Sequence, residues 1–269
     1  MRTSAFERSM TYAVLALGTV LTLYPVVLIL VKAVQPDAVG ASAGIDLGNF
    51  ADAWHQGEFS HYLLTSVIVT GSVVVGASLL SAMAGYAFGT MRFRGSSVLF
   101  YLLLTGLMVP SEAVVIPLYF QLRSVGLLDT YAALILPQIA QSLAFGTFWM
   151  RAYFRSTSRE VVEAARLDGA GHFRIFWSVL LPMGRPAVLT MMVLFFMWTW
   201  NEFLLPLVVI PSGELLTAPL GLALFQGQYT AGTSLLAAGA VLVALPVVLF
   251  YLVAQRHFIR GMVEGSVKG

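Results

Sequence analysis

Two acidic side chains, Glu112 and Glu202, stand inside long apolar stretches of this 269-residue sequence. A carboxylate is costly to place within a membrane span, so each is a candidate functional residue. If folding brought the two together, they could also act as a general acid and a general base. There is no cysteine, and the four histidines are scattered without metal-ligand spacing, so the sequence predicts no metal site.

A second group of candidates has the side chains that bind sugars. Trp198, Asn201 and Glu202 fall close together. Aromatic faces cover the C–H surface of a sugar, and planar polar groups bond to its hydroxyls. Gln138 and Gln141 are spaced to share one helical face. The same residues could instead form an interfacial aromatic belt and hydrogen bonds between helices. The candidate pathway residues are Glu112, Gln138, Gln141, Trp198, Asn201 and Glu202.

The elements that must position these residues are membrane spans. The sequence is 58% hydrophobic and 10% charged, whereas soluble proteins have roughly 25% charged residues. A helix needs about 20 residues to cross a bilayer. Apolar segments of about that length lie at 12–34, 63–88, 98–120, 131–150, 187–210 and 234–254. We therefore expect an all-α integral membrane fold with six transmembrane helices in a single domain, 1–269. The first segment is longer than a signal-peptide core of about 7–15 residues, so we expect a span rather than cleavage near 41–43.

The distribution of basic residues predicts the orientation. With a cytoplasmic N-terminus, the inside segments hold thirteen of the fifteen lysines and arginines, and only Lys32 and Arg123 lie outside. Cytoplasmic loops carry such an excess of basic residues. Both termini are therefore expected in the cytoplasm. The formal net charge of +2 does not indicate a nucleic-acid partner, and membrane lipid is the expected surrounding.

The longest polar interruption, 155–182, falls on the predicted cytoplasmic side. Residues 163–167 favour a helix, and Gly169 can adopt the left-handed conformation that ends it. A second amphipathic helix fits 172–180, and Pro182 is expected to stop it. A helix–glycine–helix element between spans suits docking to a soluble partner. The alternative is a pair of amphipathic helices lying on the membrane surface.

This interruption resembles the EAA loop of permease subunits in binding-protein-dependent ABC importers. The resemblance rests on Glu163-Ala164-Ala165, on Gly169 and on Leu181-Pro182, and Val179 stands where the family usually has isoleucine. The Asp168-Gly169-Ala170 stretch is similar to the maltose-type, carbohydrate-importing branch. The resemblance implies a type I ABC importer fold, in which this loop couples the spans to a cleft of the ATPase subunit. The coupling residues that it implies are Glu163, Ala164, Ala165, Asp168, Gly169, Leu181 and Pro182.

The resemblance also implies a function and partners. The chain would be the cell-membrane subunit of an ATP-driven sugar importer, forming half of the translocation pathway without being an enzyme. It would bind no cofactor, because ATP would be hydrolysed by a partner ATPase dimer. A second permease and an extracytoplasmic solute-binding protein would complete the complex. An alternative is a permease for another solute, such as a polyol, glycerol phosphate or amino acid. An intramembrane enzyme using Glu112 and Glu202 would leave the 155–182 loop unexplained.

Overall fold

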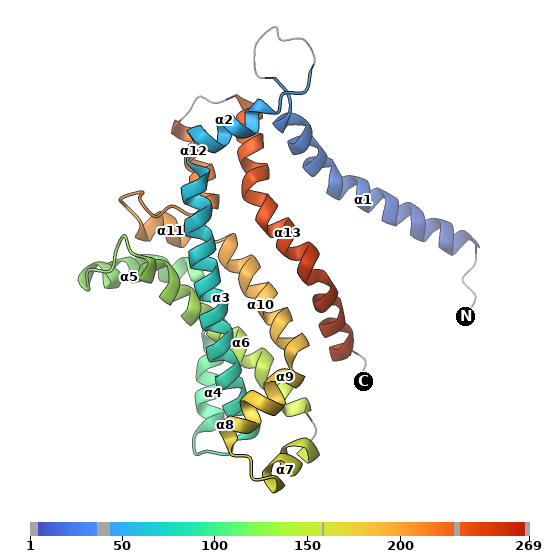
Figure 1. Cartoon of the computed structure of the whole chain (residues 1–269), viewed down its shortest axis with the longest axis vertical. Coiled ribbons are helices and arrows are strands. Elements are labelled where there is room, and N and C mark those ends of the chain that lie inside the picture. The colour runs from blue at the N-terminus through green and yellow to red at the C-terminus, as the bar shows by residue number, and fades with distance from the viewer. Residues whose placement is uncertain (1–4, 37–43, 158, 229–231, 267–269) are drawn as a thin grey trace. The chain divides into compact units, whose positions relative to one another are not determined.

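The computed structural model describes residues 5–36, 44–157, 159–228 and 232–266, and all regular elements among them are helices (Figure 1). The all-α prediction is confirmed for these residues, and the candidate cleavage residues 41–43 lie outside them. In chain order the helices are α1 (Ala5–Ala33), α2 (Gly48–Gln56), α3 (Phe59–Thr90), α4 (Ser96–Thr105), α5 (Ser111–Ser124), α6 (Tyr131–Ser156), α7 (Arg159–Leu167), α8 (His172–Arg174), the π-helix η1 (Ile175–Leu180), α9 (Leu181–Met183), α10 (Arg185–Trp200), α11 (Leu204–Val209), α12 (Ala218–Gln228) and α13 (Thr233–Ser266).

Several helices are long and apolar enough to cross a membrane. Within the described ranges these are Phe6–Ala33, Phe59–Thr90, Tyr131–Ser156 and Thr233–Gln255. A fifth crossing is present if α8–α9 and α10, which meet at a bend of 78°, count as one broken span. Four or five of the predicted spans are therefore matched by helices, and the segment 98–120 is the exception.

The segment 98–120 forms two helices with different neighbours. α4 ends at Thr105 and packs against α6, whereas α5 begins at Ser111 and packs against α11. Between them Pro110 has an extended backbone, with φ −65° and ψ 131°. Proline lacks the N–H that would continue the helical ladder, so the chain changes direction here. Neither helix alone has the roughly 20 residues that a crossing requires.

The chain divides into two compact units. Unit 1 comprises residues 1–60 and 221–246, and unit 2 comprises residues 61–220 and 247–269. Unit 1 holds α1, α2, most of α12 and the first part of α13, whereas unit 2 holds most of α3, α4 to α11 and the rest of α13. All of the predicted site residues lie in unit 2.

An amide and an aromatic pair are among the contacts that hold unit 1 together. The Asn49 side chain donates from Nδ2 to the carbonyl oxygens of Ala33 at 3.1 Å and Gln35 at 2.9 Å. These bonds fasten α2 to the end of α1. Phe59 is fully buried and meets Phe225 edge-on, with ring centroids 5.7 Å apart.

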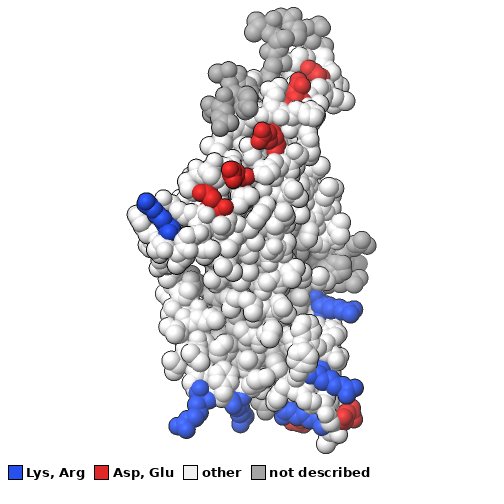
Figure 2. All heavy atoms as spheres, turned by 60° about the vertical axis from the view of Figure 1, so that its left-hand side comes forward, with Lys and Arg blue, Asp and Glu red and all other residues white. Residues whose placement is uncertain are grey.

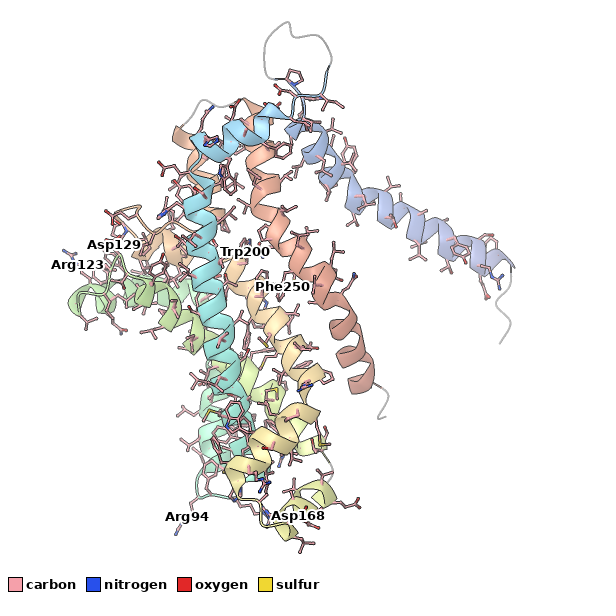
Figure 3. All side chains as sticks on the ribbon, in the orientation of Figure 1. Arg94, Arg123, Asp129, Asp168, Trp200 and Phe250 are labelled. Atoms are coloured by element: carbon pink, nitrogen blue, oxygen red, sulfur yellow. The ribbon has the colours of Figure 1, made fainter. Side chains whose placement is uncertain are left out.

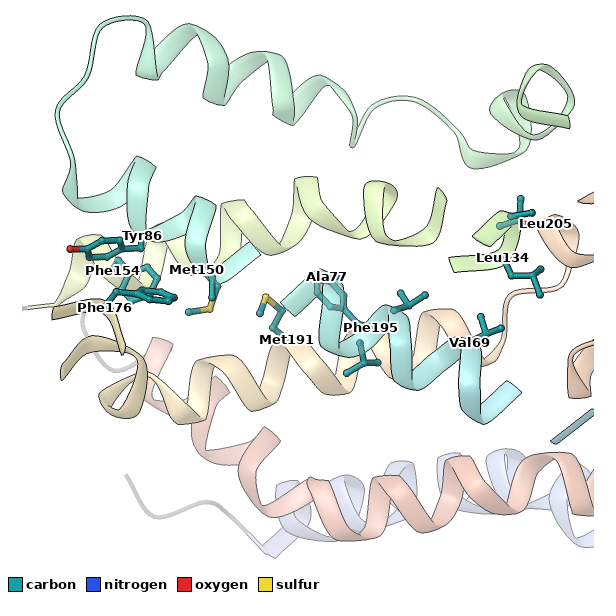
Figure 4. Close-up of a cluster of buried hydrophobic side chains, with 14 of the residues drawn as sticks. Val69, Ala77, Tyr86, Leu134, Met150, Phe154, Phe176, Met191, Phe195 and Leu205 are labelled. Carbon is teal, nitrogen blue, oxygen red and sulfur yellow. The ribbon is translucent and has the colours of Figure 1, made fainter. Parts of the chain in front are cut away.

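The core of unit 2 lies between α3, α6 and α10 (Figure 4). A Cβ atom on Gly146 of α6 would collide with Ser81 of α3 and Phe195 of α10, so glycine allows the three helices to pack closely. The core side chains labelled in Figure 4 include Val69, Ala77, Leu134, Met150, Met191 and Phe195. The packed helices form a rigid frame that carries the 155–182 loop at one end.

Candidate functional site

The first helix of the loop, α7, ends in a left-handed turn at Gly169, where φ is +78°. The Gly169 N–H donates to the Arg166 carbonyl at 3.0 Å, and the Ala170 N–H donates to the Ala165 carbonyl at 2.9 Å. This pair of bonds is the Schellman motif, which ends helices at a glycine. A side chain at this φ would strain the backbone. The predicted helix and its end at Gly169 are both confirmed.

The two alanines of the EAA-like motif face different ways. Ala165 is half-buried and packs, with Val162, against the core of unit 2. Ala164 and its neighbour Glu163 are exposed. Ala165 therefore lets α7 lie close to its own chain, whereas Glu163 and Ala164 remain exposed, and Glu163 also borders an open recess beside the end of α3.

Large apolar side chains surround the turn after α7. Leu167 is 90% exposed and Phe173 is 75% exposed, beside the exposed carboxylate of Asp168 (Figure 3). Apolar side chains exposed next to polar ones are typical of a protein contact surface. Sequence reasoning missed Leu167, although a leucine at the end of an otherwise polar helical face was a visible signal.

The second helix of the loop packs on the core through η1. The predicted helix at 172–180 is confirmed, but six of its residues have the wider π-helical geometry. Ile175, Phe176 and Leu180 are buried, whereas Phe173 and Trp177 are exposed. Short π-helical segments are rare and frequently lie at functional sites. Widening the helix changes which side chains face the core, and a regular 3.6-residue pattern does not predict this.

The stop expected at Pro182 falls two residues later, at Gly184. Pro182 is exposed, and the helix that begins at His172 continues through it to Met183. The chain bends at Gly184, which is buried, and Leu181 just before it is half-buried. A Cβ atom on Gly184 would lie 2.7 Å from the ring of Tyr153, so the bend depends on glycine at this position.

A tyrosine at the end of α3 connects the frame to the second loop helix. The Tyr86 hydroxyl lies 3.2 Å from His172 Nδ1, and it also lies 3.3 Å from the His172 carbonyl, to which it donates. The buried Tyr86 ring contacts Phe154 and Phe176, with centroids 5.7 and 5.3 Å away (Figure 4). Sequence analysis did not identify Tyr86, because nothing local distinguishes it from other tyrosines at span ends.

The two glutamines of α6 differ in exposure. Gln138 is buried, and its Nε2 donates to the Leu134 carbonyl at 2.7 Å, within the same helix. Gln141 is exposed and lines a cavity of about 340 Å³ between α4 and α6, together with Leu103 and Ala144. Their spacing correctly placed them on one helix, but only Gln141 faces open space.

The two tryptophans of α10 also differ. Trp198 is 48% exposed, and its ring meets Phe145 of α6 edge-on with centroids 5.0 Å apart. Trp200 is buried and stacks on Phe196, with centroids 5.5 Å apart. Trp198 is thus the tryptophan with an open aromatic surface.

The polar residues that follow α10 bond to nearby backbone. Asn201 Nδ2 donates to the Met197 carbonyl at 2.7 Å. A carboxylate oxygen of Glu202 accepts from the Leu205 N–H at 3.0 Å and so caps the start of α11. These residues separate the expected helix at 187–210 into α10 and α11.

Glu112 lies outside any long helix. It is exposed in the first turn of α5, just after the break at Pro110. The positive end of a helix dipole stabilises a carboxylate in this position. Glu112 therefore lies at a helix break rather than within a continuous helical span.

The fold of this chain matches that of one chain in a solved transporter. One chain in the crystal structure of a bacterial ABC transporter involved in the import of the acidic polysaccharide alginate matches this chain with a TM-score of 0.80. The match covers 96% of this chain and 99% of that chain, at 23% sequence identity. This chain therefore shares the fold of that transporter chain.

Sequence comparisons identify the family. Residues 77–264 match the model described as "Binding-protein-dependent transport system inner membrane component". The chain is 39% identical over 221 residues to the probable ABC transporter permease protein YurM of Bacillus subtilis (strain 168), which covers 82% of this chain and 73% of YurM. It is 32% identical over 268 residues to the diacetylchitobiose uptake system permease protein NgcG of Streptomyces coelicolor (strain ATCC BAA-471 / A3(2) / M145). This match covers 97% of this chain and 89% of NgcG. The chain therefore belongs to the family of inner membrane components of binding-protein-dependent transport systems, and it is a multi-pass membrane protein rather than an enzyme.

Proposed function

We propose that this chain is the transmembrane subunit of an ATP-driven sugar importer and forms half of its translocation pathway. Family membership supports import, and the uptake of diacetylchitobiose named for NgcG supports a sugar as the solute. The observation that carries the proposal is the exposed helix–glycine–helix at 155–182, which ends in a bend leading directly into α10.

The loop is proposed to couple the spans to an ATPase dimer that binds and hydrolyses ATP, so the chain itself needs no cofactor. Glu163, Ala164 and Asp168 are exposed for contact with the ATPase. Gly169 shapes the turn between the two helices, and Ala165, Leu181 and Pro182 set how the loop lies on its own chain. A charge pair made by Glu163 would contribute several kcal/mol if docking removed water from it.

The proposed topology has six crossings, with both termini in the cytoplasm and the whole chain acting as one permease domain. α4 and α5 together would supply the crossing that neither makes alone. Figure 3 shows Arg94 and Asp168 at the same end of unit 2, with Arg123 and Asp129 beside α5, away from that end. Arg92, Arg151, Arg155 and Arg166 also lie near Arg94 at the loop end. This excess of basic residues supports a cytoplasmic position for the loop under the positive-inside rule.

Two further partners are proposed, a solute-binding protein and a second permease. The family description names a binding protein, so an extracytoplasmic solute-binding protein is proposed to deliver the sugar. A second permease of similar fold would provide the other half of the pathway.

The candidate pathway residues are proposed to act in different ways. Trp198 and Gln141 are exposed within the spans and are proposed to contact solute. Gln138, Asn201 and Glu202 are proposed to shape the pathway through their bonds to helix backbone. Glu112 would lie at the break between α4 and α5, within the crossing that these two helices supply together.

The Gly169→Asp variant tests the coupling role, and the chain offers a matched control. Gly126 ends α5 with the same pair of bonds and a φ of +70°, and an added Cβ atom would meet no atom within 4 Å at either glycine. Gly169→Asp should abolish uptake and solute-stimulated ATP hydrolysis by the complete complex, whereas Gly126→Asp, with the same backbone strain, should retain both. Normal transport by Gly169→Asp, with the protein inserted in the membrane, would contradict the proposal.

A panel of labelled solutes separates sugar import from the alternative. Uptake by membrane vesicles that hold the complete complex should be competed by oligosaccharides. Competition by a polyol, glycerol phosphate or amino acid alone would support a different solute while leaving the coupling role intact.

A further inference from the structure

A basic cavity lies where the ends of α3, α4 and α6 meet α7. Its volume is about 1110 Å³. Glu163 is the single carboxylate among the lining residues. The basic side chains that line it are Arg92, Arg94, Arg151, Arg155 and Arg166. The lower end of Figure 2 shows basic side chains gathered at this end of unit 2. The lining therefore carries a large excess of positive charge and favours an anionic ligand.

The arginines are available to such a ligand. Arg151 is held in place, because its Nε donates to the Phe88 carbonyl at 3.2 Å and its guanidinium lies 3.8 Å from the Phe100 ring centroid. Across the described ranges of the chain, none of the five arginines is within ion-pair distance of a carboxylate. Their charges are thus not neutralised by neighbouring side chains.

The walls of the cavity continue into an apolar helix face. Ser96 and Ser97 line the cavity at the start of α4, where they add hydroxyl groups. Along the same helix Val98 is 71% exposed, Tyr101 is 67% exposed and Leu102 is 65% exposed. A basic recess next to an exposed apolar face at a span end matches a phospholipid, whose charged headgroup is attached to hydrocarbon chains.

We propose that this cavity binds the headgroup of an anionic phospholipid. The phosphate diester would lie among Arg92, Arg94 and Arg151, and the acyl chains would follow the exposed face of α4. Basic pockets between transmembrane helices on the cytoplasmic side favour anionic headgroups for the same electrostatic reason. A free phosphate would use only the arginines and would gain nothing from the apolar face.

A bound lipid would also contact the coupling loop. Val162, Glu163 and Arg166 of α7 line the same cavity. The headgroup would therefore stabilise α7 against the ends of α3 and α4, and the anionic lipid content of the membrane would influence how the loop presents Glu163. This site does not depend on which solute is carried, so it goes beyond the proposed function.

The test compares two double variants of the full chain, purified in its complex. Arg92→Gln with Arg94→Gln removes two cavity charges, and Arg8→Gln with Arg185→Gln removes two charges on the same predicted side but outside the cavity. Each complex is placed in phosphatidylcholine nanodiscs that contain increasing fractions of phosphatidylglycerol. The complex is then released from the nanodiscs, and the phosphatidylglycerol that stays bound to it is measured by native mass spectrometry. The cavity variant should bind phosphatidylglycerol about 30-fold more weakly, since each basic residue contributes roughly a factor of five.

Two further measurements distinguish a bound phospholipid from a free phosphate compound. Ser97→Asp adds a negative charge while leaving each arginine in place, and it should also weaken retention. Soluble glycerol phosphate has the charged group without acyl chains and should not displace the lipid. Equal retention by the two double variants, or displacement by glycerol phosphate alone, would overturn the proposal.

Discussion

The 155–182 loop and the stretch that follows α10 both place polar residues next to apolar helices, but they use them differently. In the loop, Glu163 and Asp168 are exposed, and neither side chain bonds to any residue that the structure describes. After α10, the side chains of Asn201 and Glu202 bond to backbone groups only a few residues away. Exposed groups remain available to a partner, whereas bonded groups define where helices begin and end. Substitutions of exposed and of bonded residues should therefore affect transport to different degrees.

Reversing the charge of Glu163 is expected to have the largest effect. Glu163→Lys should lower uptake by about a hundredfold, because a charge pair broken in a desolvated interface costs about 2–5 kcal/mol. Uptake and ATP hydrolysis by the reconstituted complex are the measurements. Glu163→Gln, which keeps the shape of the side chain, should lower uptake less than Glu163→Lys does. Full uptake with Glu163→Lys would mean that exposure in the loop does not indicate docking.

Trp198 tests whether an exposed residue within the spans also serves a ligand. Trp198→Ala should raise the sugar concentration for half-maximal uptake about tenfold, because an aromatic contact contributes about 0.5–1.5 kcal/mol beyond its buried area. Trp198→Phe keeps a ring and should remain near wild type. If both variants change only the ATP hydrolysed per sugar, Trp198 acts in packing against Phe145 instead.

The Tyr86 hydroxyl should have an intermediate effect. Tyr86→Phe keeps the ring contacts with Phe154 and Phe176 but removes the bond to His172, which is worth about 1 kcal/mol. The loop should dock less firmly, so transport per ATP should fall about fivefold at unchanged membrane insertion. Tyr119→Phe in α5 is the matched control. An equal loss in both variants would argue against a specific role for Tyr86.

Asn201 should have the smallest effect. Its amide bonds to the Met197 carbonyl, so Asn201→Ala removes a local side-chain bond and changes uptake by about twofold or less. The measurement is uptake over a range of sugar concentrations. A tenfold change would move Asn201 into the same class as Trp198 and remove the distinction between bonded and exposed polar residues.

The loop was predictable because its signals are local. A glycine at the end of an amphipathic helix adopts positive φ wherever the helix lies, so the turn at Gly169 followed from sequence alone. Pro110 is expected to interrupt the helical ladder, but the high hydropathy over 98–120 predicted a single span rather than two separate helices. α4 and α5 separate through packing against different partners, which no local pattern shows.

Long-range contacts account for the rest of the site. The Tyr86–His172 contact joins residues 86 positions apart, and no local sequence pattern predicts that these two residues meet. Helical spacing placed Gln138 and Gln141 on one helix, but the neighbouring helices decide which of them is buried. The π-helical geometry of η1 likewise depends on fitting Ile175, Phe176 and Leu180 into the core.

The bend at Gly184 has a mechanical consequence. Because the two arms meet at 78°, a displacement along the short α8–α9 arm is nearly transverse to α10. The longer arm would therefore swing about Gly184 rather than slide along its own axis. α10 has 16 residues and is about 24 Å long, so a swing of about 5° would carry its far end about 2 Å sideways.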